Sequence, residues 1–445
     1  MGVRSLFKQI KDGKEGKNVG ISMGLPDLDK ILYGIQRKSL NVVGADTAGG
    51  KTSFALDVYV YNALKNRGDK QVDILFYSFE MSAESLYAKL LSRYLYDNYG
   101  KVLSYEEILS FTSPISDEDY KLLLEAQKWL ESVEQFITIY DKQLTPNAIY
   151  ATLKEWLRRF GEFITLGDHK EDYIEHDSEA YRIVLVDHVG LISGQGSKKE
   201  RIDKVVDFLI YFREKCSITG VLVQQLNRNA KSMDRKLNGY ETVQLDDFQD
   251  TSGTTQGANV VIALYFPYRE KIPRCEGYPV QNILRQNFRL IQILKNRFGR
   301  ADVNKGTTFH GEIGMFRELP RPEEIMDYDE FLDLEYVAPD PIVIDKEKCF
   351  IDDCRYIESL YNNIKFFGGN RKYDWKVLYN FENKDVPNLI DRYSSTTSLF
   401  KSDKKLLAVL DDLYPKLYAK LKNKQLIKEH NDKEGYLFID FINIR

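Results

Sequence analysis

The stretch GADTAGGKTS, residues 44–53, has the composition of a loop that binds the phosphate groups of a nucleotide. Such a loop turns backbone N–H groups toward the phosphates and adds a lysine and a hydroxyl residue that holds Mg²⁺. Gly50, Lys51 and Thr52 match the end of the pattern G-x-x-x-x-G-K-[ST], whereas Ala45 replaces its first glycine. An ordinary glycine-rich turn is the alternative, but a strand-like run before the loop and a helix-like run after it favour nucleotide binding. The predicted nucleotide-binding residues are Ala45, Asp46, Thr47, Ala48, Gly49, Gly50, Lys51, Thr52 and Ser53.

Two acidic residues stand where a nucleotide-hydrolysing site needs carboxylates. Asp187 ends the apolar run IVLVD, and Glu80 ends the run ILFYSFE. Each acid alone is equally compatible with a role at the start of a helix. Ligands of open α/β sheets bind at the carboxyl ends of the strands. We therefore expect Thr52 and Asp187 to hold Mg²⁺ and Glu80 to act in hydrolysis.

The elements that must position these residues alternate between strand-like and helix-like runs from about residue 21 to 318. Most strand-like runs are continuously apolar, which is typical of strands buried on both faces. This alternation predicts an α/β fold with a mostly parallel central sheet, closed by an edge hairpin at residues 307–316. The expected strands are residues 39–45, 72–78, 136–141, 182–188, 220–225, 259–266 and 289–295.

Three further segments flank or interrupt this domain. Residues 1–20 are basic and polar, and we expect a linker segment with a short helix around Leu6 and Ile10. Residues 161–181 are acidic and break the periodicity, so we expect a solvated surface insertion, with a metal site at its two histidines as the alternative. Residues 325–445 change composition, and their lysine-rich, helix-like runs predict an α-rich C-terminal accessory module.

The composition narrows the class of protein. A chain of 445 residues with a net charge of -4 gives no global charge signal for nucleic acid, so any DNA site must be a local basic patch. The four cysteines contain no C-x-x-C pair, which argues against a zinc ribbon or a disulfide framework. The charged N-terminus is unlike a signal peptide, and no apolar run is long enough for a membrane span. We expect a cytoplasmic protein, in a bacterial cell or a phage-infected host, with no membrane partner.

Several motifs in order resemble one family. YSFEMSAESLYAKLLSRYL, IVLVDHVGLISG, VLVQQLNRNA and ILKNRFGR are similar, in order and spacing, to the C-terminal RecA-like ATPase domain of DnaB-type replicative DNA helicases. The similarity covers about residues 18–317 and includes the loop at Ala45, a position where this family often has alanine. It implies a RecA-like P-loop NTPase core, a homo-oligomer in the form of a hexameric ring around single-stranded DNA, and ATP bound with Mg²⁺ between subunits.

The resemblance also implies roles for single residues. Lys51 contacts the phosphates, Glu80 activates water, and Gln225 senses the γ-phosphate. Lys295 and Arg297 match a basic pair that reaches into the ATP site of the neighbouring subunit. The alternatives are a buried glutamine at a strand end for Gln225, and a solvated strand end for the basic pair.

The family places DNA contacts on loops that face the centre of the ring. Two loops of this chain, residues 193–201 and 227–241, carry glycines and basic residues that suit contacts with phosphates. Solvated surface charge is the alternative for each residue taken singly. The predicted DNA-binding residues are Lys198, Lys199, Arg201, Lys231, Arg235 and Lys236.

The chain departs from the family at both ends. About 20 residues precede the ATPase core, so we expect the N-terminal collar domain, which engages primase, to be missing, and the module after residue 325 has no counterpart in the family pattern. We expect an ATP-dependent replicative helicase, moving 5′-to-3′ as the family implies, encoded by a phage or mobile element. Its expected partners are single-stranded or forked DNA, with primase or a helicase loader as further candidates. The alternative is a RecA-like ATPase that acts as a non-unwinding switch, helicase loader or recombination mediator.

Overall fold

The structure, a computed structural model, divides into two compact units, residues 1–336 and 337–445. The residues that the structure describes are 3–14, 16, 18–111, 113–166, 170–226, 242–248, 252–333, 427–431 and 437–441.

A nine-stranded sheet forms the centre of the first unit, in the order β13-β12-β11-β8-β1-β7-β6-β2-β3. The strands from β8 to β3 in this order pair in parallel, and β11, β12 and β13 extend the sheet with antiparallel pairs. The mostly parallel α/β fold and the edge hairpin are both as predicted. The strands are β1 (Ser39–Ala45), β2 (Val72–Ser78), β3 (Ile137–Tyr140), β6 (Tyr181–Asp187), β7 (Thr219–Gln225), β8 (Val260–Tyr265), β11 (Phe288–Asn296), β12 (Val303–His310) and β13 (Met315–Glu318).

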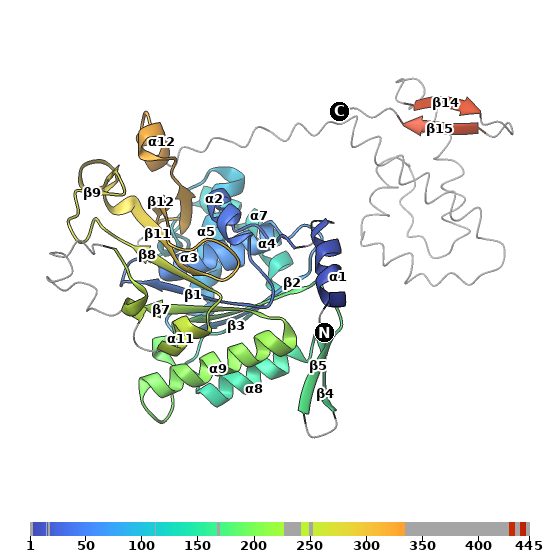
Figure 1. The fold of residues 1–445 in the computed structure, drawn as a ribbon. Helices are drawn as coiled ribbons and strands as arrows, with labels where there is room; N and C mark the ends of the chain where they lie inside the picture. Colours follow the sequence, from blue (N-terminus) through green and yellow to red (C-terminus); the bar gives the residue numbers. More distant parts are fainter. Residues whose placement is uncertain are drawn as a thin grey trace. The chain divides into compact units, whose positions relative to one another are not determined.

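Helices cover both faces of this sheet (Figure 1). One face carries α3, α5 and α7, and the opposite face carries α8 and α9. The longer helices begin at serine or threonine caps, such as Ser82 before α5 and Ser197 before α9. The helices of the first unit include α1 (Val3–Lys14), α2 (Pro26–Leu32), α3 (Lys51–Leu56), α4 (Ala63–Lys65), α5 (Ala83–Tyr99), α6 (Tyr105–Ile108), α7 (Asp117–Glu134), α8 (Pro146–Leu157), α9 (Lys198–Cys216), α11 (Ser252–Gly257) and α12 (Asp329–Leu332).

The strands are apolar on both sides because each side faces its own hydrophobic core. In β6, Ile183 and Leu185 belong to one core, and Val184 and Val186 belong to the other. Successive side chains of a strand point to opposite faces, so both sets must be apolar when both faces are covered. This double burial explains the continuous apolar runs of the sequence.

The insertion at residues 161–181 is more regular than expected. Instead of a solvated loop it forms an antiparallel hairpin of β4 (Gly161–Leu166) and β5 (Lys170–Glu175). The rings of Phe163 and Tyr173 pack on each other at a centroid distance of 4.7 Å and join the core under α8 and α9. Their burial gives the hairpin an apolar side, which the acidic composition concealed. The described residues contain no cluster of His, Cys, Asp or Glu that would suit a metal ion.

The first unit also extends past the boundary expected near residue 324. Ile325, Tyr328, Phe331 and Leu332 pack against the core around β11, so α12 belongs to this unit. In the second unit the structure describes one antiparallel hairpin, β14 (Ile427–Asn431) paired with β15 (Leu437–Phe441). The lysine-rich helices predicted before it lie outside the described residues. Among the helices described in either unit, none has the length and apolar character needed to cross a membrane.

Candidate nucleotide-binding and active site

The carboxyl ends of the parallel strands bring the predicted site residues to one edge of the sheet. Asp187 at the end of β6 pairs with Ser78 of β2, two residues before Glu80. Ala45 at the end of β1 pairs with Gln225 at the end of β7. The phosphate loop leaves β1 at this same edge, as expected for open α/β sheets.

Ala45 is compatible with this loop because it still belongs to the strand. It is fully buried and has no positive φ, so glycine is not required at this position. Glycine is required further along, because a Cβ on Gly49 would lie 2.8 Å from the Cβ of Ala45. Gly50 has a φ of 93° and begins α3, where Phe54 donates the first helical hydrogen bond to its carbonyl.

Gly44, directly before Ala45, is required for packing and not for backbone freedom. It lies within β1, and its backbone carries no positive φ. A Cβ at this position would lie 2.2 Å from the ring of Phe248. The glycine is therefore a packing requirement at the end of the strand.

Lys51 and Glu80 form an ion pair across the site. The Nζ of Lys51 lies 3.4 Å from Oε2 of Glu80, and the lysine is largely buried whereas the Glu80 side chain is about half exposed. A lysine at this position binds phosphates in nucleotide-loaded loops.

Asp187 has the environment of a metal ligand. It is 1% exposed, and neither carboxylate oxygen has a hydrogen-bond partner of regular geometry. Burial raises the pKa of Asp187 to about 6, while the Thr52 hydroxyl and the Lys51 ammonium oppose the shift and Glu80 adds to it. A buried carboxylate that lacks a regular hydrogen bond and lies beside the hydroxyl of Thr52 fits the oxygen ligands that Mg²⁺ prefers.

Gln225 contacts the phosphate loop directly. Its Nε2 donates to the Thr47 hydroxyl at 2.8 Å, and this hydrogen bond connects the tip of the loop with the end of β7. Arg269, which the sequence did not single out, donates from Nη1 to the carbonyl of Thr47 at 2.6 Å. The loop tip is thus held from two neighbouring strand ends.

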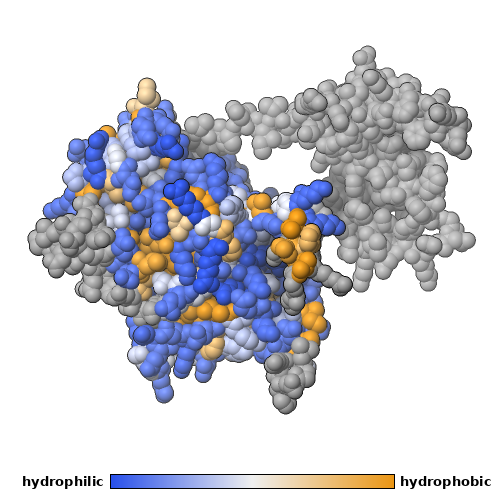
Figure 2. Space-filling view, viewed as in Figure 1, coloured by the Kyte–Doolittle hydropathy of each residue, from blue (hydrophilic) through white to orange (hydrophobic). Residues whose placement is uncertain are grey.

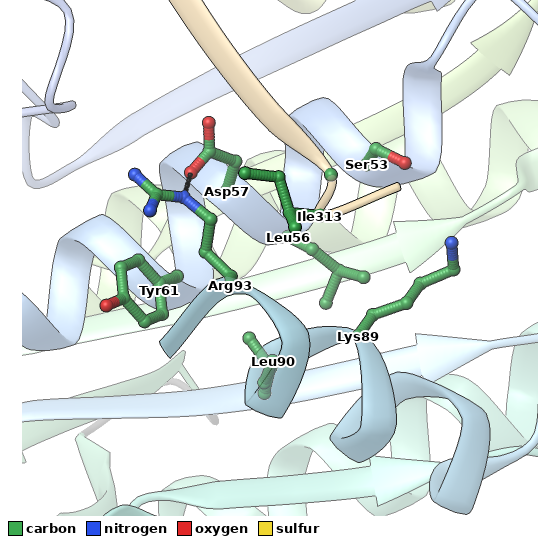
Figure 3. Close-up of a pocket in the computed structure, with 9 residues that line it drawn as sticks. Ser53, Leu56, Asp57, Tyr61, Lys89, Leu90, Arg93 and Ile313 are labelled. Carbon is green, nitrogen blue, oxygen red and sulfur yellow. Dashed lines mark hydrogen bonds and ion pairs between the residues drawn. The ribbon is translucent and has the colours of Figure 1, made fainter. Parts of the chain in front are cut away.

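A small pocket lies beside α3 and shows how the loop helix is anchored (Figure 3). Arg93 donates to Asp57 at 3.1 Å, and the second carboxylate oxygen of Asp57 accepts from the N–H of Phe316 at 2.9 Å. Ser53 and Lys89 lie at the other end of the pocket, and burial lowers the pKa of Lys89. The buried ion pair ties the helical run after Lys51 to α5 and to the edge hairpin.

Lys295 and Arg297 lie at the opposite edge of the sheet, where the parallel strands begin. β11 runs antiparallel to β8, so its last residues pair with the first residues of β8, away from the phosphate loop. The Nζ of Lys295 donates to the carbonyls of Thr255 and Gln256, and Arg297 also donates to Gln256. The pair therefore does not contact the phosphate loop of its own chain.

The predicted DNA-binding residues have different surroundings. Lys198 and Lys199 lie exposed in the first turn of α9, after the loop that leaves β6. Arg201 donates to the carbonyls of Ile192, Gly194 and Gly196, at 2.8, 3.4 and 2.6 Å, so it shapes the loop. The remaining candidates, Lys231, Arg235 and Lys236, lie outside the described residues.

The sheet, the phosphate loop and the acids at neighbouring strand ends define a P-loop ATPase fold of the RecA-like type. More narrowly, the chain belongs to the DnaB-like helicase C terminal domain family, which matches residues 20–318. This confirms the resemblance drawn from the sequence motifs.

Individual relatives agree with this assignment. The chain is 25% identical over 256 residues to the replicative DNA helicase DnaB of Rickettsia typhi, covering 56% of this chain and 45% of the relative. It is 23% identical over 276 residues to DnaB of Geobacillus stearothermophilus, covering 58% of this chain and 53% of the relative. The chain thus spans about half the length of the curated relatives it matches.

Two solved structures share the fold. An ATPase domain solved by itself superposes with a TM-score of 0.55 at 20% identity, covering 72% of this chain and 100% of that domain. A DnaB-like replicative helicase, solved in a study of its interactions with primase, gives a TM-score of 0.54 at 20% identity, covering 72% of this chain and 68% of the helicase. At this level of identity the likeness concerns the fold.

Proposed function

We propose that this protein is an ATP-dependent DNA helicase that works as a ring of identical subunits. ATP would bind at Ala45–Ser53, and the energy of hydrolysis would drive movement along single-stranded DNA. The observation that carries the proposal is the division of the machinery between two edges of one sheet. Lys51, Glu80 and Asp187 lie at one edge, and Lys295 with Arg297 at the other.

The division between edges supports a site that a second subunit completes. Phosphoryl transfer needs a metal ligand, a group that orients water and a cation that neutralises the developing charge. The first two are present beside the phosphate loop, but Arg297 points to the carbonyl of Gln256 at the far edge. A neighbouring subunit that brings its far edge to this loop would complete the site.

Each residue then has a definable task. Lys51 leaves Glu80 for the phosphates, and Glu80 orients the attacking water and accepts its proton. Thr52 and Asp187 would hold Mg²⁺, which neutralises charge on the phosphate oxygens. Gln225 touches the loop tip through Thr47 and would report whether the γ-phosphate is present.

The helix α1 supports assembly into a ring. Val3, Leu6, Phe7 and Ile10 recur at helical spacing and are 70%, 53%, 64% and 54% exposed. Figure 2 shows apolar surface at the place of α1. We propose that this stripe packs on the neighbouring subunit, as the linker helix of the family does. A 5′-to-3′ polarity and partners such as primase or a loader remain proposals of the same kind, and a phage source and cytoplasmic location remain predictions.

The deciding experiment is unwinding of a forked DNA by the full chain with ATP and Mg²⁺. Lys51→Ala removes phosphate binding, so strand separation should occur with the wild type and not with this variant. Arg297→Ala serves as a second variant, because it should retain ATP binding and lose hydrolysis. ATP hydrolysis without strand separation would instead support the non-unwinding switch or loader. Absence of ATP binding by the wild type would overturn both.

A further inference from the structure

An arginine at the start of β11 contacts the backbone of the phosphate loop. Arg289 is 3% exposed, and its Nε donates to the carbonyl of Gly49 at 3.0 Å. Its Nη2 donates to the carbonyl of Ala48 at 3.2 Å. Its Nη1 donates to the carbonyls of Gln286 and Phe288, at 2.7 and 2.8 Å. All of these acceptors are backbone oxygens, and two of them belong to the loop.

The charge of this guanidinium is not balanced by an acid. In the part of the chain that the structure describes, Arg289 forms no ion pair. Its Cζ lies 3.5 Å from the centre of the Phe266 ring and 5.1 Å from that of Phe309. Burial lowers the pKa of Arg289 to about 9, so the group stays protonated at neutral pH. A buried, unpaired cation is unfavourable, and an apolar side chain of similar size would cost less.

The geometry indicates what the cation contributes. In a planar trans peptide the C=O and the following N–H point in opposite directions. The N–H of Gly49 already donates to the carbonyl of Asp46, at 2.9 Å. When Arg289 holds the carbonyl of Gly49, the N–H of Gly50 is directed away from the arginine. The guanidinium also places a positive charge within hydrogen-bond distance of the loop that is proposed to bind anionic phosphates.

We propose that Arg289 is a positioning residue for nucleotide phosphates, acting through the Ala48 and Gly49 carbonyls and through its charge. The inference rests on the proposed nucleotide site at Ala45–Ser53 and adds a residue to it from a distant strand. Its ligand class is a nucleoside di- or triphosphate, because the charge acts where the phosphates lie and not where the base lies. AMP should therefore depend on Arg289 less than ADP and ATP do.

The test compares three variants of the full chain in a nucleotide-binding titration. A fluorescent ADP analogue is the probe, and ATP, ADP and AMP compete with it in the presence of Mg²⁺. Arg289→Met removes the charge and the planar set of guanidinium N–H donors. Arg289→Lys keeps the charge but cannot hold two carbonyls in the same way. Arg182→Met is the matched control. Arg182 is 8% exposed and lies over Phe160 at 4.3 Å, but it is placed at the start of β6, away from the loop.

Arg289→Met should weaken ATP and ADP binding about 10- to 100-fold, the size expected for lost charged hydrogen bonds. Arg289→Lys should weaken it severalfold, and Arg182→Met should lower the melting temperature and leave nucleotide affinity unchanged. Wild-type affinity in a folded Arg289→Met protein would overturn the proposal. If that variant does not fold, wild-type affinity in Arg289→Lys would overturn it.

The same titration separates the inference from the proposed function. Lys51→Ala should abolish binding of the probe. If the wild type itself fails to bind, the nucleotide site is wrong. If the wild type binds, Lys51→Ala does not, and Arg289→Met binds as the wild type does, then the site stands and the role of Arg289 is refuted.

Discussion

Replacing Asp187 by asparagine should make the nucleotide-free protein more stable while it removes activity. Asp187 is almost completely buried at the end of β6, and its carboxylate oxygens lack regular hydrogen-bond partners. Such a group is unfavourable when charged, and the cost is recovered only when a cation binds. An asparagine side chain would fill the same volume without the charge.

The size of the effect follows from the pKa of Asp187, which burial raises from 3.8 to about 6. The difference of about 2 pKa units corresponds to about 3 kcal/mol of unfolding free energy. The folded state favours the protonated form of Asp187. The carboxyl group therefore contributes its full stabilisation below about pH 4, and this stabilisation is lost as the pH rises from about 4 through 6. Asp187→Asn should therefore be more stable than the wild type by about 3 kcal/mol at pH 7.5 and by about half of that at pH 5.

The assay is urea unfolding with EDTA and without nucleotide, repeated between pH 5 and 8. Addition of Mg²⁺ and ADP should stabilise the wild type and have little effect on Asp187→Asn. Asp57→Asn is the control with the opposite sign, because the Asp57 carboxylate has partners. It pairs with Arg93 and accepts from the N–H of Phe316, so loss of its charge weakens these contacts and leaves Arg93 paired with Asp97 alone. A variant that is less stable than the wild type at pH 7.5, or a gain that does not change with pH, would refute the reasoning.

Three further predictions test other parts of the structure. Arg297→Ala and Lys51→Ala should each abolish ATP hydrolysis. Mixing the two proteins should restore part of it, because some interfaces then combine an intact loop with an intact arginine. No recovery in a steady-state ATPase assay would argue against action between subunits. Gly44→Ala should lower the unfolding free energy by about 1 to 3 kcal/mol in thermal unfolding, because the added methyl group overlaps a buried phenylalanine ring. Lys199→Ala should reduce the slope of single-strand DNA affinity against salt concentration by roughly one released ion, and it should leave the melting temperature unchanged. Arg201→Ala should lower the melting temperature, because the loop carbonyls that it holds lose their donor. Equal behaviour of the two variants would contradict a DNA-binding role for Lys199 and a structural role for Arg201.

The strand pattern and the main acids could be predicted because their signals are local. Continuous apolar runs marked the central strands, and each of the acids Glu80 and Asp187 followed such a run directly. Parallel topology then brings strand ends together, whatever the length of chain between them. In the structure Lys51 and Glu80 lie 3.4 Å apart, although the sequence did not predict this contact.

Other features depend on contacts that no local pattern reveals. The requirement for glycine at position 44 comes from a phenylalanine 204 positions away, Phe248. The acidic composition of residues 161–181 suggested a loop, although Phe163 and Tyr173 bury one side of a hairpin. Arg289 was missed because it is a single charge at the start of an apolar strand, and its acceptor at Gly49 is 240 positions earlier.

The strand β11 gives these separate observations a common basis. Arg289 at its start contacts the phosphate loop of its own chain, and Lys295, six residues later, lies at the far edge of the sheet. At about 3.4 Å per residue the two lie roughly 20 Å apart along one strand, which pairs with β12 up to Ile293 and with β8 from Leu290 onward. In the proposed ring, this strand would have one end in its own nucleotide site and the other in the neighbour's. A shift of the loop on hydrolysis would then act on a single rigid element that also positions Arg297. Under this reasoning Arg289→Met should lower the cooperativity of ATP hydrolysis as well as affinity, and an unchanged Hill coefficient would mean that β11 does not connect the two sites.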